Sequence, residues 1–273
     1  MRKYHLFHLV DPSPWPLLSA VALFNLVVSF VGYIHSYDGF VEDFVFHFFN
    51  LALVAALWWR DVIREATHGG HHTRPVREGL KMGFVLFLVS EGMLFFSLFW
   101  TFFYLSVHPG YALGTLWSAH LLSEVAPADT VPLVNTYLLL WSGVTLTYSH
   151  YRLLGGDPVG AMNGLVCTLG LGFVFLALQG VEYRNNKFDI SDGVFGSTFY
   201  LLTGFHGLHV IIGWVFLAVA AARLDAGHLD RTRHLGYEMA IWYWHFVDVV
   251  WLFLFFSVYV WGTYSPGGAA HPG

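Results

Sequence analysis

One carboxylic acid, Glu91, stands near the middle of the apolar stretch from Met82 to Leu105. This stretch is long enough for a helix to cross a bilayer, and an ionisable group at such a depth is costly enough to indicate a functional site. Its helical neighbours at three and four residues are all apolar. Glu91 must therefore be protonated, paired with another helix or next to internal water, and we expect it to be protonated at neutral pH because burial disfavours the charged form.

Histidines are the other residues that could support chemistry. His206 and His209 lie one helical turn apart, a spacing that can chelate a metal, but an imidazole there can equally hydrogen-bond a neighbouring helix. His245 can pair with Asp248, three residues later on the same helical face. We predict that these four side chains are buried polar packing residues and that the chain holds no metal and no catalytic group of its own.

The composition indicates a membrane protein. Hydrophobic residues make up 56% of the 273 and charged residues 11%, against about a quarter charged in soluble domains. The single cysteine excludes an internal disulfide, a Cys-x-x-Cys metal site and a Cys-x-x-Cys-His haem attachment. A net charge of −5 at pH 7 with His neutral, without a Lys/Arg run, gives no sign of nucleic-acid binding. We also expect the first apolar run to be retained as a helix, since no small-residue cleavage site follows it.

Seven apolar runs predict seven membrane-spanning helices in one membrane domain that covers 1–273. The second run is the weakest, because it contains His47 and Asn50 and would have to extend through Asp61 to span comfortably. The runs are Trp15 to Ile34, Phe44 to Trp59, Met82 to Leu105, Val131 to Tyr148, Ala161 to Val181, Phe199 to Ala222 and Ala240 to Trp261.

The basic residues support this number of helices. With seven spans, eleven of the 13 Lys and Arg residues fall on one side of the membrane and only Arg184 and Lys187 on the other. Because basic residues gather on the inner side, the sequence predicts an N-terminus inside and a C-terminus outside. Without the weak second span the partition would be lost.

Two helices carry further polar signals. In the fourth run, hydroxyl and amide side chains can bond across helices, namely Asn135, Thr136, Ser142, Thr145 and Thr147. After the second run, Trp58 and Trp59 adjoin Arg60 and Arg64, an arrangement that suits a lipid head group but also an ordinary aromatic belt with surface ion pairs.

Several long strings resemble one known family. WWRDVIREAT with HHT, SEGMLFF, PLVNTYLLLWSGVTLT, LQGVEY, DGVFGSTFYLLTGFHGLHVIIG and GYEMAIWYWHFVDVVWLFLF are together similar to subunit III of the aa3-type cytochrome c oxidases. The resemblance runs in order from about Trp15 to Gly262. Departures include Gly180 where alanine is usual and a third connection, Ser106 to Thr130, without the usual Trp-Pro-Pro element.

The resemblance implies an all-α integral membrane fold in which two helices (15–66) and five helices (82–262) enclose a lipid-filled cleft. It implies a non-redox subunit that stabilises the catalytic subunit I and supports proton uptake, beside subunit II and further small subunits. Haem a and copper would lie in those partners, cytochrome c would be the substrate of the complex, and structural phospholipids would be the only ligands of this chain.

Two sets of residues carry over from the family. Glu91, in the pair Ser90-Glu91, matches a buried acid linked to proton uptake. The lipid-contacting positions fall on Trp58, Trp59, Arg64, Glu65, His72 and Arg223.

Other functions remain as alternatives. A stand-alone seven-helix proton or solute transporter could use Glu91, His206, His209 and Asp248 as a relay, but it would favour an inverted repeat and broken helices. A catalytic haem protein would need axial histidine pairs in defined helices. The expected location is the mitochondrial inner membrane, with the bacterial plasma membrane as the alternative.

Overall fold

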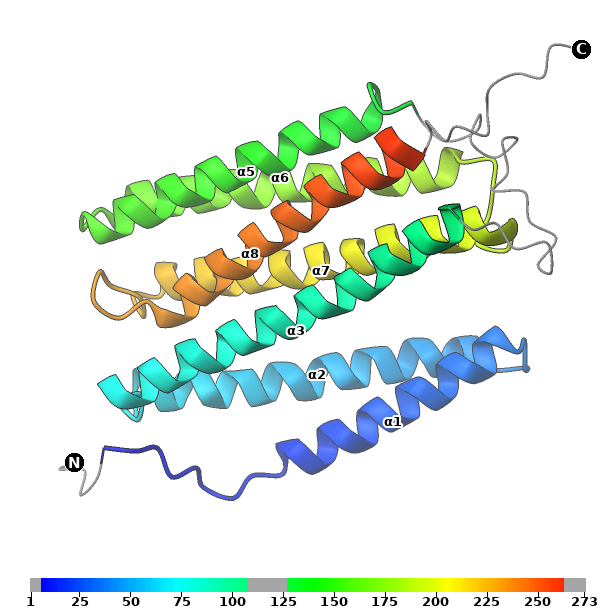
Figure 1. The fold of residues 1–273 in the computed structure, drawn as a ribbon. Helices are drawn as coiled ribbons and strands as arrows, with labels where there is room; N and C mark the ends of the chain where they lie inside the picture. Colours follow the sequence, from blue (N-terminus) through cyan, green and yellow to red (C-terminus); the bar gives the residue numbers. More distant parts are fainter. Residues whose placement is uncertain (1–5, 108–126, 263–273) are drawn as a thin grey trace, which may run out of the picture. The chain divides into compact units, whose positions relative to one another are not determined.

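The computed structural model describes residues 6–107 and 127–262, and the regular structure in these ranges is helical throughout (Figure 1). Seven α-helices are present there, followed by a π-helical turn that continues the last one, so the prediction of seven helices is confirmed. Six of the predicted runs each lie inside one α-helix, and the seventh, Ala240 to Trp261, spans α8 and the π-helical turn. The elements are α1 (Trp15–Ile34), α2 (Phe40–Thr67), α3 (Arg74–Val107), α5 (Val131–Leu154), α6 (Pro158–Asn185), α7 (Gly193–Asp225), α8 (Leu235–Leu254) and η2 (Phe255–Trp261).

Six of these helices are long and apolar enough to cross a membrane, among the residues described. The second is one of them, because α2 continues past the apolar run and through Asp61 to Thr67. Helix α5 is not among the six, and its hydroxyl and amide side chains account for its lower hydropathy. The side of the membrane on which each connection lies remains a prediction, and Arg2, Lys3 and most of the third connection fall outside the described residues.

The chain divides into two compact units, the first ending at Met82 and the second beginning at Gly83. In the first unit, α1 and α2 form an antiparallel hairpin (Figure 1). The indole Nε1 of Trp15 donates a hydrogen bond of 2.8 Å to Asp61 Oδ2, which joins the start of α1 to the last third of α2. At the other end, a Cβ at Gly32 would overlap the Phe40 ring, so glycine permits this close approach.

The second unit holds most of the buried core. Trp244 and Trp251 of α8, Phe175 of α6 and Phe199 of α7 are each 1% exposed or less. Helix α3 joins this core through aromatic side chains, of which Phe95 and Phe102 are buried. The unit therefore holds α5 to α8, and α3 from Gly83 onward, around a core of large rings.

Helices α5 and α6 form an antiparallel pair with a short connection. Gly156 adopts the left-handed conformation there, with φ of +79°, which residues other than glycine adopt at a cost. Asp157 caps α6, since its Oδ1 accepts a hydrogen bond of 2.9 Å from the backbone N–H of Gly160. The tight turn fixes the register in which polar groups of α5 meet α6.

Candidate functional site

Glu91 is paired across to another helix. Its Oε2 lies 2.8 Å from Nε2 of His209 on α7, and the Phe95 ring packs edge-on against the same imidazole at 4.9 Å between centroids. The His209 side chain is 7% exposed and that of Glu91 22%. Of the three possibilities open to an acid inside an apolar helix, the structure thus shows pairing with another helix.

The hydrogen bonds of His209 fix how many protons the pair shares. Its Nδ1 lies 2.7 Å from the carbonyl oxygen of Phe205, and a carbonyl only accepts, so Nδ1 carries a hydrogen. A neutral imidazole then presents a bare Nε2 to Glu91, and the carboxyl must donate. A charged imidazole donates from Nε2 to a carboxylate instead. In both cases a single proton lies between Glu91 and His209, and the pair has no net charge.

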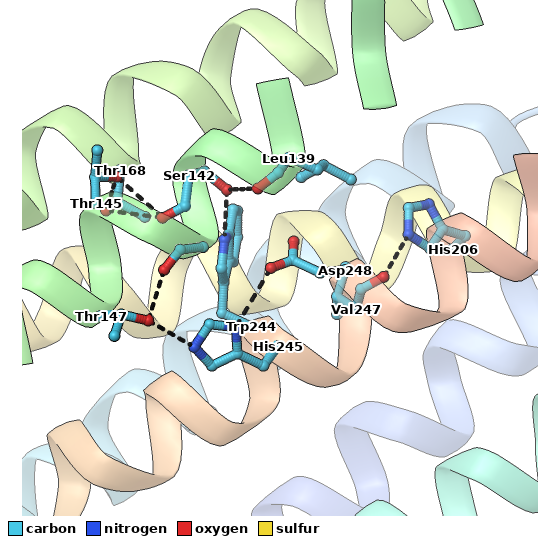
Figure 2. A network of polar contacts seen from close by, with 11 residues as sticks. Leu139, Ser142, Thr145, Thr147, Thr168, His206, Trp244, His245, Val247 and Asp248 are labelled. Atoms are coloured by element: carbon cyan, nitrogen blue, oxygen red, sulfur yellow. Dashed lines mark hydrogen bonds and ion pairs between the residues drawn. The ribbon is translucent and has the colours of Figure 1, made fainter. Parts of the chain in front are cut away.

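His206 takes part in a separate contact. Its Nε2 donates to the carbonyl oxygen of Val247 on α8 at 3.2 Å, and the residue is 1% exposed. Figure 2 shows this bond at the edge of the α5–α8 polar network. The two histidines of α7 therefore have different partners.

Within 6–107 and 127–262, no group of three or more His, Cys, Asp or Glu side chains could hold a metal ion.

His245 and Asp248 face each other on α8, with Nδ1 and Oδ2 3.5 Å apart (Figure 2). Thr147 of α5 lies on the other side of the imidazole, with Oγ1 3.4 Å from Nε2. Gly143 makes room for this group, because a Cβ there would lie 2.8 Å from Asp248 Oδ2. The Asp248 side chain is buried, whereas that of His245 is 43% exposed in the chain by itself. The pair therefore opens to the surface through the imidazole.

The polar residues of α5 bond across helices, as the sequence predicted. The indole Nε1 of Trp244 donates to Ser142 Oγ at 2.8 Å, and that of Trp251 donates to Thr136 Oγ1 at 3.0 Å. Thr145 bonds Thr168 of α6 at 2.8 Å between hydroxyl oxygens (Figure 2). These bonds give the hydroxyl groups of Thr136, Ser142 and Thr145 partners on other helices.

The first unit brings most of the positions that we predict to contact lipid together near the end of α2. Trp58 and Trp59 are 38% and 65% exposed, and Arg64 is also exposed. Glu65 Oε2 lies 3.6 Å from His8 Nε2, and the His8 ring lies 5.9 Å from that of His72. Aromatic, basic and histidine side chains thus share one end of this unit.

Arg223 belongs to the second unit, in the last turn of α7. Its guanidinium lies against the backbone of α8, where a Cβ at Gly236 would be 2.7 Å from Nη1. The Nε atom is buried and has no hydrogen-bond partner among the described residues. This half-buried cation is therefore only partly satisfied by the protein.

A third acid, Glu182 of α6, is more buried than Glu91, at 4% exposed. Sequence reasoning missed it, because the fifth predicted run ends at Val181 and leaves Glu182 just outside the span. Its Oε1 accepts a hydrogen bond of 2.7 Å from the hydroxyl of Tyr259. The signal that could have revealed it is Gln179, three residues earlier on the same face of an otherwise apolar helix.

Comparisons with known proteins agree on one family. A family model described as cytochrome c oxidase subunit III matches residues 5–263. Cytochrome c oxidase subunit 3 of Pylaiella littoralis is 48% identical over 262 residues, covering 96% of both chains. The Allomyces macrogynus protein of that name is 50% identical over 264 residues, 96% of this chain and 95% of its own. That of Arabidopsis thaliana is 46% identical over 258 residues, 94% of this chain and 97% of its own.

Proposed function

Because the chain belongs to the cytochrome c oxidase subunit III family, and so forms part of that oxidase, we propose that it is the non-redox core subunit that stabilises the catalytic subunit and supports its proton uptake. The observation that carries this proposal is the match along nearly the whole chain, at about half of all positions identical.

Support for a role in proton uptake comes from Glu91 and His209. Two titratable groups 2.8 Å apart that share one proton can take up or pass on a proton with only small movements of heavy atoms. The carboxyl is partly exposed at the surface of the chain, so the pair is not sealed inside the bundle. It is suited to hold a proton beside a partner subunit.

The redox chemistry belongs, in this proposal, to partner subunits. Subunit I and subunit II would hold haem a and copper and accept electrons from cytochrome c, with further small subunits around them. The polar side chains of α5, α7 and α8 are engaged with one another, and the described residues offer no ligand set for a metal. The large apolar exposed surface would face lipid and these partners.

Structural phospholipids are the proposed ligands of this chain. Trp58 and Trp59 would lie at the glycerol level, with Arg64, Glu65 and His72 around the head group. Arg223 would bind phosphate through a guanidinium that the protein leaves partly unpaired. Such lipids would fill the cleft that the family resemblance implies.

We place the protein in the mitochondrial inner membrane, with the bacterial plasma membrane as the alternative. The relatives from Allomyces and Arabidopsis are eukaryotic, which favours the first. A stand-alone proton or solute transporter is the competing function, and α3 and α7 run unbroken through the positions of Glu91 and His209, which argues against it.

Purification from native membranes tests the proposal. A mild detergent extract captured through a tag on this chain should contain haem-bearing partners and oxidise cytochrome c. Oxidase lacking the chain should keep its haem spectrum but lose activity faster during turnover. Recovery of the chain alone, with no haem protein, would contradict the oxidase assignment.

A further inference from the structure

Four polar side chains meet deep in the second unit, where α5, α6 and η2 pack together. Asn135 comes from α5, Gln179 and Glu182 from α6, and Tyr259 from η2. Asn135 and Tyr259 are 0% exposed, Glu182 4% and Gln179 6%. We call these four residues the α5–α6–η2 polar cluster. None of them belongs to the Glu91 pair or to the lipid-contacting set.

Two hydrogen bonds join these side chains in pairs, and the Gln179 amide also lies beside the Tyr259 hydroxyl. Asn135 Nδ2 donates to Gln179 Oε1 at 3.4 Å, and the Tyr259 hydroxyl donates to Glu182 Oε1 at 2.7 Å. Three buried atoms have no hydrogen-bond partner among the described residues, namely Asn135 Oδ1, Gln179 Nε2 and Glu182 Oε2. Flipping the side-chain amides of Asn135 and Gln179 would change which of their atoms are hydrogen-bonded. The number of atoms without a partner would stay at three.

Unpaired atoms of this kind are costly in an apolar bundle, and the carboxyl adds to the cost. No Lys, Arg or His among the described residues forms an ion pair with Glu182. A buried carboxyl without a cation needs a proton, further donors or hydration. The unused atoms are a donor on Gln179 and acceptors on Asn135 and Glu182, which is the mixture that a water molecule satisfies through two to four hydrogen bonds.

We propose that the α5–α6–η2 polar cluster binds internal water, held between Gln179 Nε2, Glu182 Oε2 and Asn135 Oδ1. Water there completes the hydrogen bonding of three helical segments and solvates a carboxyl that lacks an ionic partner. The π-helical turn supports the assignment, since such widened turns often mark functional positions, and this one carries Tyr259 to Glu182. The result is a hydrated carboxyl at a second place in the chain, apart from Glu91.

A map of the intact oxidase, at a resolution that reveals other buried waters, tests this directly. We expect a density peak within about 3.2 Å of at least two of the three atoms. Two outcomes would overturn the proposal. One is direct contact between Gln179 Nε2 and Glu182 Oε2, and the other is no density in the cluster while waters elsewhere in the complex are resolved.

A pair of variants of the same helix sharpens the test. Gln179→Met keeps the length of the side chain but removes the donor, so the water peak should be lost. Tyr183→Phe is the matched control, because the Tyr183 hydroxyl donates directly to Thr203 Oγ1 at 2.6 Å and its loss should leave the peak unchanged. A peak that persists in Gln179→Met with the same contacts to protein would count against the proposal. If that variant does not assemble, the wild-type map decides.

Discussion

The imidazole of His209 on α7 lies 2.8 Å from the carboxyl of Glu91 on α3, and its other nitrogen is bonded to the carbonyl of Phe205. Glu91 thus gives α3 a polar contact with α7, beside the contacts that phenylalanine rings of α3 make with that helix. The contact joins residues 118 positions apart. It sets the rotation of α3 about its own axis relative to α7.

The shared proton leads to a prediction for Glu91. Glu91→Gln can donate from its amide to a neutral His209 and should keep assembly and stability close to wild type. Glu91→Ala leaves His209 Nε2 without its partner and should cost about 1–3 kcal/mol, measured as an earlier midpoint of thermal inactivation. Equal loss in both variants would contradict the single shared proton.

Infrared difference spectra test which partner holds that proton. If the carboxyl carries it at neutral pH, as the sequence led us to expect, the oxidase should show a protonated-carboxyl band that Glu91→Gln removes. An unchanged band in the variant would exclude Glu91 as its source. Glu182→Gln and Asp248→Asn are the controls for the two other buried acids among the described residues of the second unit.

The centres of the helices could be predicted, and their ends could not. Run lengths and the charge bias gave seven spans, and for α1 even the limits agree with the structure. Helix α3, however, begins at Arg74, eight residues before its apolar run. A salt bridge of 3.1 Å between Arg74 and Glu78 supports this polar extension, and hydropathy alone does not reveal it.

Tertiary pairing explains what else escaped the sequence. Spacing on one helix predicted that His245 and Asp248 could meet, since the helix itself fixes that geometry. The partner of Glu91 depends on how α3 and α7 are rotated and packed, which no local pattern encodes. Tyr259 reaches Glu182 from a π-helical turn, and an assumed α-helical repeat would place it on a different face.

The bond between Trp244 and Ser142 offers a double-mutant cycle. Ser142→Ala leaves the buried indole N–H without an acceptor and should cost about 1–3 kcal/mol. Trp244→Phe removes the donor too, so the double variant should lose about 1 kcal/mol less than the sum of the single losses. Thermal inactivation of the assembled oxidase provides the measurement. Thr101→Ala, which removes only an exposed bond to Ser97 O within α3, should change stability by less than about 0.5 kcal/mol.

Gly164 permits a close contact between α5 and α6. A Cβ at Gly164 would lie 2.9 Å from Ser149 Cβ and 3.0 Å from the carbonyl oxygen of Thr145, so Gly164→Ala should destabilise the chain by about 1–3 kcal/mol. Gly170 of the same helix has nothing within 4 Å of such a Cβ. Gly170→Ala should be neutral or stabilising by up to about 1 kcal/mol. Similar effects of the two substitutions would contradict the packing argument.

If Arg64 and Arg223 bind phospholipid, replacing them should lower the lipid content of the oxidase, whereas replacing Arg74 should not. Arg64→Ala and Arg223→Ala should each weaken phospholipid binding about fivefold, since one basic residue near a lipid surface contributes about 1 kcal/mol, and together they should shorten the working life of the oxidase. Phospholipid content of the purified complex and its activity during prolonged turnover are the measurements. Arg74→Ala removes a cation paired with Glu78 and should leave both unchanged. Unchanged lipid content in the double variant would exclude both residues as phospholipid-binding residues.

The connection between α7 and α8 should open in acid. Hydrogen bonds from the hydroxyl of Thr232, its backbone N–H and that of Arg233, all to Oδ1 of Asp230, hold the pKa of Asp230 below its ordinary value.

A carboxyl whose pKa is lower in the folded state stabilises it above the unfolded pKa, about 3.9, and this contribution is lost as the pH falls through the folded value. Hydrogen exchange at the amides of Thr232 and Arg233, corrected for intrinsic rates, should therefore rise on acidification below about pH 4. Asp230→Asn cannot titrate and should remove that rise, so an identical acid response in both proteins would show that Asp230 does not control the turn.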